Sequence, residues 1–161
     1  MSESYSFRAT VRPADRQAVR AVLDSTGFFY PEETAVAVEL VDERLARGEA
    51  SGYFFDFAEI SGRVAGYSCY GPIACTKASY DLFWLVVHQE QRGRGLGRLL
   101  LARAEESIRR QGGRRVYIET SSRPLYEPTR GFYLACGYRL EAVLAEFYAP
   151  GDGKAIFVKV F

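Results

Sequence analysis

The fold is decided by the stretch L-V-V-H-Q-E-Q-R-G-R-G-L-G-R-L-L-L, residues 85–101. An apolar run typical of a buried strand leads into a turn with three glycines in five residues, and a helix-forming run follows. The first N–H groups of a helix have no intrahelical acceptor and lie at the positive end of the helix dipole. The stretch therefore predicts a strand–turn–helix unit that binds a phosphate or pyrophosphate.

Periodicity and turn residues predict the elements on either side of this unit. Gly27 is expected to end the first helix, and Ser61-Gly62 is expected to form a two-residue hairpin turn. The predicted strands are residues 5–11, 53–60, 64–70, 79–87, 115–120, 138–148 and 154–160, and the predicted helices are residues 13–26, 31–47, 96–110 and 128–136.

This order of elements predicts an α/β fold of the α+β type. Hairpins dominate before the glycine turn, so we expect a mixed, mostly antiparallel sheet with helices on both faces. The one β-α-β crossover surrounds the glycine turn, and only its two strands need to be parallel. A chain of 161 residues without repeats or a linker fits one domain, residues 1–161.

Composition argues against several classes of protein. Apolar residues make up 48% and charged residues 25% of the chain, as in soluble globular proteins. The 21 Lys and Arg balance 20 Asp and Glu, so no broad positive field is expected for nucleic acid or a membrane. We recognise no signal peptide or membrane span. The three cysteines are scattered along the sequence, which indicates free thiols, and the two observations together indicate a cytoplasmic protein. A single histidine, His88, argues against a metal centre.

Three phosphate-binding motifs compete for the glycine turn. A Walker P-loop needs G-x-x-x-x-G-K-[ST], which is missing. The dinucleotide fingerprint G-x-G-x-x-G usually lies in an early β-α-β unit, whereas Gly93, Gly95 and Gly97 follow G-x-G-x-G past mid-chain. The third motif, [QR]-x-x-G-x-[GA], is matched by Arg92, Gly95 and Gly97.

Through this motif and a second one, the chain resembles the GNAT superfamily of N-acetyltransferases. Arg92-x-x-Gly95-x-Gly97 resembles that family's coenzyme A pyrophosphate motif, and G-F-Y-L-A-C-G-Y at 131–138 resembles its later F-Y-x-x-x-G-[FY] element. The order of elements is also similar, so the resemblance covers nearly the whole chain. The stretches E-T-S-S and F-Y-A-P-G-D-G-K, around Glu119 and Tyr148, resemble a bacterial subgroup of the superfamily.

The resemblance implies an enzyme that transfers an acetyl group from acetyl-CoA directly to a primary amine of a small molecule or peptide, without a metal. N–H groups of the turn would hold the pyrophosphate, and the preceding strand would bind pantetheine and polarise the thioester carbonyl. The cofactor-binding residues implied in this way are Leu85, Val86, Val87, Arg92, Gly93, Arg94, Gly95, Leu96, Gly97, Arg98, Thr129 and Tyr133.

The resemblance also implies catalytic residues. Tyr133 matches the family tyrosine that donates a proton to the leaving thiolate, and a phenol with a pKa near ~10 is protonated at neutral pH. Glu119 is the first candidate for the base that accepts the amine proton, through water, and Asp81 is the second. Tyr126 stands where many family members have an asparagine that contacts pantetheine. The expected replacements for that contact are Ser121, Ser122, Tyr126 and Thr129.

The resemblance also implies where the acceptor amine binds. In this fold the loops at 26–31 and 148–154 usually frame it, and an aromatic lining suits a small-molecule pocket. The acceptor-binding residues predicted here are Phe28, Phe29, Tyr30 and Asp81. An amino acid, a small amine, an antibiotic, a protein N-terminus and a lysine all remain open as acceptors, and either a monomer or a homodimer fits.

Two other functions compete with this interpretation. A non-catalytic acyl-CoA-binding sensor would use the same turn without turnover, although the presence of Tyr133 argues against it. Nucleic-acid binding would use the basic cluster Arg109, Arg110, Arg114 and Arg115, but no aromatic residues interleave with that cluster, as stacking on bases requires.

Overall fold

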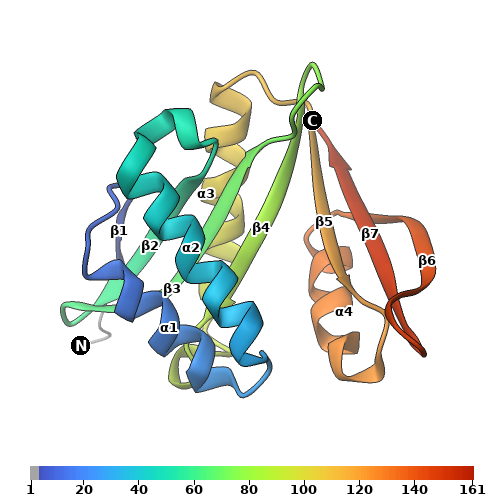
Figure 1. The fold of residues 1–161 in the computed structure, drawn as a ribbon, viewed down its shortest axis with the longest axis horizontal. Coiled ribbons are helices and arrows are strands. Elements are labelled where there is room, and N and C mark those ends of the chain that lie inside the picture. Colours follow the sequence, from blue (N-terminus) through green and yellow to red (C-terminus); the bar gives the residue numbers. More distant parts are fainter. Residues whose placement is uncertain (1–3) are drawn as a thin grey trace. The chain divides into compact units, whose positions relative to one another are not determined.

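The computed structural model describes residues 4–161 and follows the predicted order of elements (Figure 1). Within these residues seven strands form a sheet in the order β1-β2-β3-β4-β5-β7-β6. Strands β4 and β5 are parallel, and the pairs β1–β2, β2–β3, β5–β7 and β6–β7 are antiparallel. This confirms the predicted mixed, mostly antiparallel fold. The helices are α1 (Asp15–Thr26), α2 (Pro31–Arg47), α3 (Leu96–Arg110) and α4 (Glu127–Ala135), and the strands are β1 (Ser6–Arg8), β2 (Phe54–Ile60), β3 (Arg63–Pro72), β4 (Ser79–Val87), β5 (Arg115–Ser121), β6 (Arg139–Ala149) and β7 (Asp152–Val160).

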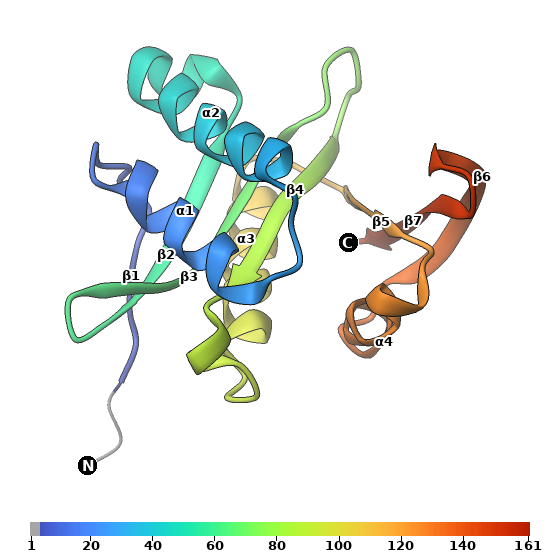
Figure 2. The ribbon, with the colours of Figure 1, turned by 60° about the horizontal axis from the view of Figure 1, so that its bottom comes forward.

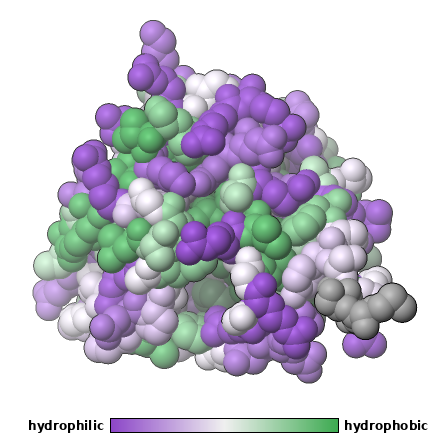
Figure 3. All heavy atoms as spheres, turned by 180° about the vertical axis from the view of Figure 1, so that it is seen from behind, coloured by the Kyte–Doolittle hydropathy of each residue, from purple (hydrophilic) through white to green (hydrophobic). Residues whose placement is uncertain are grey.

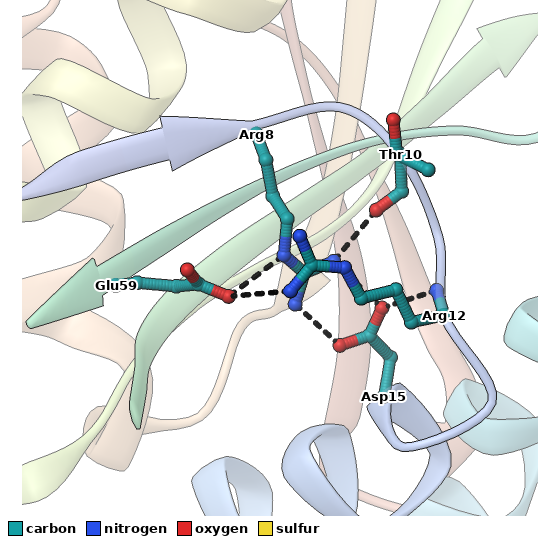
Figure 4. Close-up of polar contacts among 5 residues, drawn as sticks. All are labelled: Arg8, Thr10, Arg12, Asp15 and Glu59. Carbon is teal, nitrogen blue, oxygen red and sulfur yellow. Dashed lines mark hydrogen bonds and ion pairs between the residues drawn. The ribbon is translucent and has the colours of Figure 1, made fainter. Parts of the chain in front are cut away.

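The start of the chain differs most from the prediction. The strand predicted at 5–11 covers only Ser6–Arg8, and the helix predicted from Pro13 begins at Asp15. Figure 4 shows the cause, because the Asp15 carboxylate binds the Arg8 guanidinium at 2.6 and 2.8 Å and accepts the N–H of Arg12 at 2.7 Å. Arg8 also donates to the carbonyl of Thr10 and to Glu59. These contacts turn the chain away from the sheet directly after Arg8.

The chain divides into two compact units, and β4 contributes residues to both. The first unit comprises residues 1–71 and 84–107, and the second comprises residues 72–83 and 108–161. The expectation of a single domain over 1–161 remains a prediction.

The first unit has apolar cores on both faces of its strands. Helices α1 and α2 lie on one face and α3 lies on the other (Figures 1 and 2). Val19, Val22, Ala37 and Val41 pack with Phe57 and neighbouring strand residues on the first face. Ala58, Ala65, Leu96 and Leu100 form the core on the α3 face. Leu96 and Leu100 lie one turn apart at the start of α3. Their burial fixes the start of this helix, and therefore the end of the glycine turn.

The second unit is built around β5 and β7. Val116, Ile118, Phe157 and Val158 are at most 2% exposed, and α4 packs against this pair through Tyr133. Strand β6 lies at the end of the sheet, and its side chains are exposed except for the half-buried Ala142. Figure 3 shows green, hydrophobic surface at the left, where β6 lies after the half turn from Figure 1. The exposed apolar residues of this strand are Leu140, Val143, Leu144, Phe147 and Tyr148.

Candidate active site

The glycine turn connects the end of β4 to the start of α3. Gly93 and Gly95 have φ values of +75° and +80°, a conformation that favours glycine, whereas Gly97 is the second residue of α3. A Cβ at Gly93 or Gly95 would meet nothing within 4 Å, so the space above the turn is open. Leu96 is 1% exposed, which buries the side chain of the first helical residue and leaves the helix N–H groups at the turn. The arrangement fits a pyrophosphate.

Three arginines, Arg92, Arg94 and Arg98, surround the turn, and all three are exposed. Arg94 lies 3.4 Å from the Gln91 side-chain oxygen, and the Arg92 guanidinium lies over the ring of Phe28, 5.1 Å from its centroid. Cationic side chains at a helix N-terminus oppose the helix dipole unless an anion is present there. The predicted arginines therefore add positive charge to a site that already favours an anion.

The loop between α1 and α2 does not place its three predicted acceptor residues in one environment. Phe29 packs edge-on against Trp84, with ring centroids 5.5 Å apart, next to the core. Phe28 lies under Arg92, and Tyr30 is 62% exposed at the start of α2. The end of α1 also contacts the segment before the turn, because Gln89 donates its N–H to Ser25 Oγ at 3.1 Å. The loop and the glycine turn are thus physically linked.

The end of β4 carries the predicted pantetheine-binding residues. Leu85 and Val87 pack towards the core on the α3 face, and the buried Val86 belongs to the core on the opposite face. In the described part of the chain the β4–β5 ladder pairs Ser79–Asp81 with Arg115–Tyr117, so residues 82–87 lie beyond it. Gly66 of β3 lies close to this segment, because a Cβ there would be 2.8 Å from the Val86 carbonyl oxygen.

Tyr133 lies in an aromatic cluster of the second unit. It is 6% exposed, and its ring centroid is 5.9 Å from that of Tyr138 and 6.2 Å from that of Phe157. Burial, and to a smaller extent Cys136, raises the pKa of the Tyr133 phenol. The hydroxyl therefore keeps its proton at neutral pH and can donate it in a hydrogen bond.

The two predicted carboxylates share one face of the second unit. Asp81 pairs with Tyr117, and Glu119 follows two residues later on β5, so alternation places both carboxylates on the same side. Glu119 forms an ion pair with Lys154 at 2.8 Å, which sequence reasoning did not predict. Burial, followed by the negative charge of Glu119, raises the pKa of Asp81 to about 6, and the positive charge of Lys154 opposes this rise. Asp81 is thus a carboxylate with a pKa closer to neutrality than usual.

The residues expected to replace the asparagine contact are largely engaged within the protein. Ser121 Oγ donates to Asp152, and Ser122 Oγ accepts the N–H of Gly153 at 2.8 Å. The Arg123 guanidinium lies over the Tyr126 ring, 5.5 Å from its centroid. Thr129 is half-buried in the first turn of α4. These bonds tie the β5–α4 connection to the β6–β7 hairpin, and Thr129 has no such tie among the described contacts.

Comparison with known proteins identifies the family. Residues 17–138 match the model of the acetyltransferase (GNAT) family. The chain belongs to the GNAT family. A crystal structure of a GNAT-family protein from Desulfovibrio desulfuricans is 48% identical, covering 98% of this chain and 99% of that one, with a TM-score of 0.96. No curated protein sequence matches at a significant level. The GNAT family carries out acetyl-CoA-dependent acetyl transfer, and this is the reaction assigned to the chain.

More distant GNAT structures share the fold. An aminoglycoside 6′-N-acetyltransferase complexed with coenzyme A has a TM-score of 0.78 at 20% identity, covering 98% of this chain and 96% of that one. A ribosomal-protein-alanine N-acetyltransferase from Brucella melitensis has a TM-score of 0.78 at 22% identity, covering 97% of this chain and 99% of that one. Because these two proteins are named for different acceptors, the GNAT fold alone does not select one.

Within residues 4–161 no helix is long and apolar enough to cross a membrane. In the same part of the chain no group of three or more His, Cys, Asp or Glu side chains is placed to hold a metal ion.

Proposed function

We propose that the chain transfers the acetyl group of acetyl-CoA to a primary amine of a small molecule or peptide. The observation that carries the proposal is the turn at Gly93 and Gly95, whose positive φ values direct the chain into α3 with open space above it. Backbone N–H groups from Arg92 to Arg98 bind the pyrophosphate, and the three exposed arginines add charge. Leu85, Val86 and Val87 offer backbone groups beyond the β4–β5 ladder to pantetheine and to the thioester carbonyl.

The acid and the base of the proposed reaction lie on opposite faces of β5. Tyr133 packs on Phe157, which pairs with Ile118, so it shares the Ile118 face. Glu119 is the next residue along the strand and therefore lies on the other face, together with Asp81. This separation suits a reaction in which the amine approaches from one side and the thiolate leaves towards the other.

Proton transfers in the proposed reaction follow from these positions. The ammonium form of the acceptor gives one proton to a carboxylate on the Asp81 face, and the free amine forms the C–N bond as the C–S bond breaks. The second N–H proton ends on sulfur, whose electron pair is stabilised by a hydrogen bond from Tyr133. A phenol is ordinarily a weaker acid than a thiol, and burial raises the pKa of Tyr133 further, so hydrogen bonding is favoured over complete transfer of the phenol proton.

Thr129 is the remaining candidate for the pantetheine contact. Ser121 and Ser122 are held by the β6–β7 hairpin, whereas Thr129 is half-buried in the first turn of α4. We propose that its hydroxyl supplies the hydrogen bond for which many family members use asparagine.

Calorimetric titration with acetyl-CoA tests the cofactor site. Gly95→Glu places an anionic side chain at the turn and should abolish micromolar binding. Gly62→Glu is the matched control, because Gly62 has a φ of +75° and open space but lies in the β2–β3 hairpin. It should bind like wild type. Equal loss in both variants, or no binding by wild type, would overturn the proposed site.

Thiol release in a screen of primary amines tests turnover. The screen should include an aminoglycoside, free amino acids and peptides with a free N-terminus or lysine. Release that depends on one amine class, with an acetylated product detected by mass spectrometry, supports the transferase. Tight binding of acetyl-CoA without turnover on any amine would favour the acyl-CoA sensor.

A further inference from the structure

Lys154 lies in a cage of one carboxylate and two aromatic rings. Its ammonium is 2.8 Å from Glu119 Oε2, 3.7 Å from the centroid of the Phe147 ring and 5.9 Å from that of Tyr148. The Lys154 side chain is 12% exposed. A cation over an aromatic face is stabilised electrostatically, and more so where water is excluded. The Glu119 carboxylate and the two aromatic rings therefore hold the Lys154 ammonium together.

This ion pair shares its face of the strands with Asp81. In antiparallel pairing Ser121 lies opposite Lys154 and Glu119 lies opposite Ile156, and directly paired residues share a face. Asp81 joins that face through its pairing with Tyr117. Four other charged groups lie on this face. Asp152 and Arg123 bind each other at 3.2 Å, and Arg115 and Arg139 pair with Val160 and Val158 near the far end of β7. Within residues 4–161 Asp81 forms no ion pair, whereas Glu119 does.

We propose that Lys154 is a positioning residue, which holds Glu119 in an ion pair and leaves Asp81 as the carboxylate that accepts the amine proton. This inference rests on the proposed function and reverses the order of the two candidate bases. The Lys154 ammonium occupies Glu119 Oε2 at 2.8 Å, so a proton delivered to that oxygen would have to displace this contact. A half-buried, unpaired carboxylate with a pKa of about 6 is better matched to accepting a proton near neutral pH.

The charges around Asp81 predict the direction in which each substitution moves its titration midpoint. Glu119 raises and Lys154 lowers the pKa of Asp81. Lys154→Met removes the ammonium but keeps the apolar stem, so Asp81 would face the full charge of Glu119. The Asp81 midpoint should rise by about one pH unit. Glu119→Gln should lower the midpoint, and Lys154→Arg should leave it close to wild type.

Carbon-13 NMR titration of the Asp81 carboxyl group, assigned with Asp81→Asn, measures this midpoint without any substrate. Backbone amide spectra of each variant establish that the fold is kept. An unchanged midpoint in Lys154→Met, or an equal rise in Lys154→Arg, would overturn the positioning role. A merely structural lysine would change stability without moving the midpoint.

Turnover then identifies the base. With the amine selected by the screen, the acid limb of the kcat/KM profile should move with the Asp81 midpoint in each variant, and Asp81→Asn should lose at least about a hundredfold in kcat. If Asp81→Asn keeps turnover and Glu119→Gln loses it, Glu119 is the base and the inference is wrong. A third outcome is that the midpoints move as expected but neither the wild type nor any variant turns over. The proposed function and the role of Asp81 as base would then both be wrong, while the electrostatic effect of Lys154 on Asp81 would stand.

Discussion

The guanidinium carbon of Arg92 lies 5.1 Å from the centroid of the Phe28 ring. One residue belongs to the glycine turn and the other to the loop between α1 and α2. The nearby bond from Gln89 to Ser25 joins the segment before the turn to the end of α1. The sequence predicts Phe28 as an acceptor contact, and in the structure its ring orients a charged side chain of the proposed pyrophosphate site.

Phe28→Leu is expected to weaken acetyl-CoA binding two- to fivefold. An exposed cation–π contact contributes about 0.5–1 kcal/mol, and leucine keeps apolar bulk but has no aromatic face. Phe28→Tyr keeps the face and should bind like wild type. Calorimetric titration measures both, and Phe28→Leu should add nothing in an Arg92→Met background. A further loss in that background would show that Phe28 acts independently of Arg92.

Arg8→Met is expected to destabilise the protein by about 3 kcal/mol. The Asp15 side chain is 2% exposed, and removing Arg8 would leave its buried charge with one backbone N–H as partner. Arg12→Met is the control, because Arg12 is 60% exposed and lies 3.9 Å from Glu59. It should cost less than about 1 kcal/mol. Urea denaturation measures the free energy of unfolding of both variants. Similar losses would mean that the buried Arg8–Asp15 pair stabilises the fold no more than an exposed ion pair does.

Local signals predicted several elements within one or two residues. Helix α2 starts at Pro31 and ends at Arg47 as expected, because proline at the first helical position and Gly48 beyond the end act locally. Strand β4 has the predicted bounds, and Gly27 ends α1 in the left-handed conformation. These signals depend on residues adjacent in sequence, so sequence reasoning can find them.

Contacts between distant residues account for what the sequence did not predict. Strand β7 begins at Asp152 instead of 154, because Ala149 pairs with Asp152 across a tight Pro150-Gly151 turn. The Lys154–Glu119 pair depends on the β5–β7 register, which composition and periodicity do not define. The bonds of Ser121 and Ser122 to the β6–β7 hairpin have the same origin.

Tyr133→Phe is expected to lower kcat about a hundredfold while leaving the Kd for acetyl-CoA unchanged. The substitution removes a hydrogen-bond donor to the leaving thiolate, and removing one such donor to a developing anion costs about 10²–10³-fold in kcat. Tyr138→Phe is the matched control, since Tyr138 is 3% exposed in the same aromatic cluster. It should keep kcat within about threefold, the scatter expected of a change that removes no catalytic interaction. Equal losses in the two variants would identify Tyr133 as a packing residue.

Asp81→Asn is expected to stabilise the fold at neutral pH. The folded-state pKa of Asp81, about 6, lies above the unfolded value near 3.8, so the folded chain binds more protons between these values. The carboxylate therefore costs stability progressively as the pH rises from about 4 to 6, and the cost is complete above pH 6. Asparagine has no such charge, and the gain at pH 7.5 should be about 1 kcal/mol after allowing for solvent screening of a half-buried group.

Urea denaturation at pH 7.5 and pH 4 checks this prediction. The gain from Asp81→Asn should be present at pH 7.5 and should vanish at pH 4, where the wild-type carboxyl group is protonated in the folded state. Glu106→Gln, which changes an exposed carboxylate on α3, is the control for a general loss of negative charge. A gain that persists at pH 4 would point to asparagine packing better than aspartic acid. A stabilised variant without turnover would show that the carboxylate is retained for the reaction at a cost to the fold.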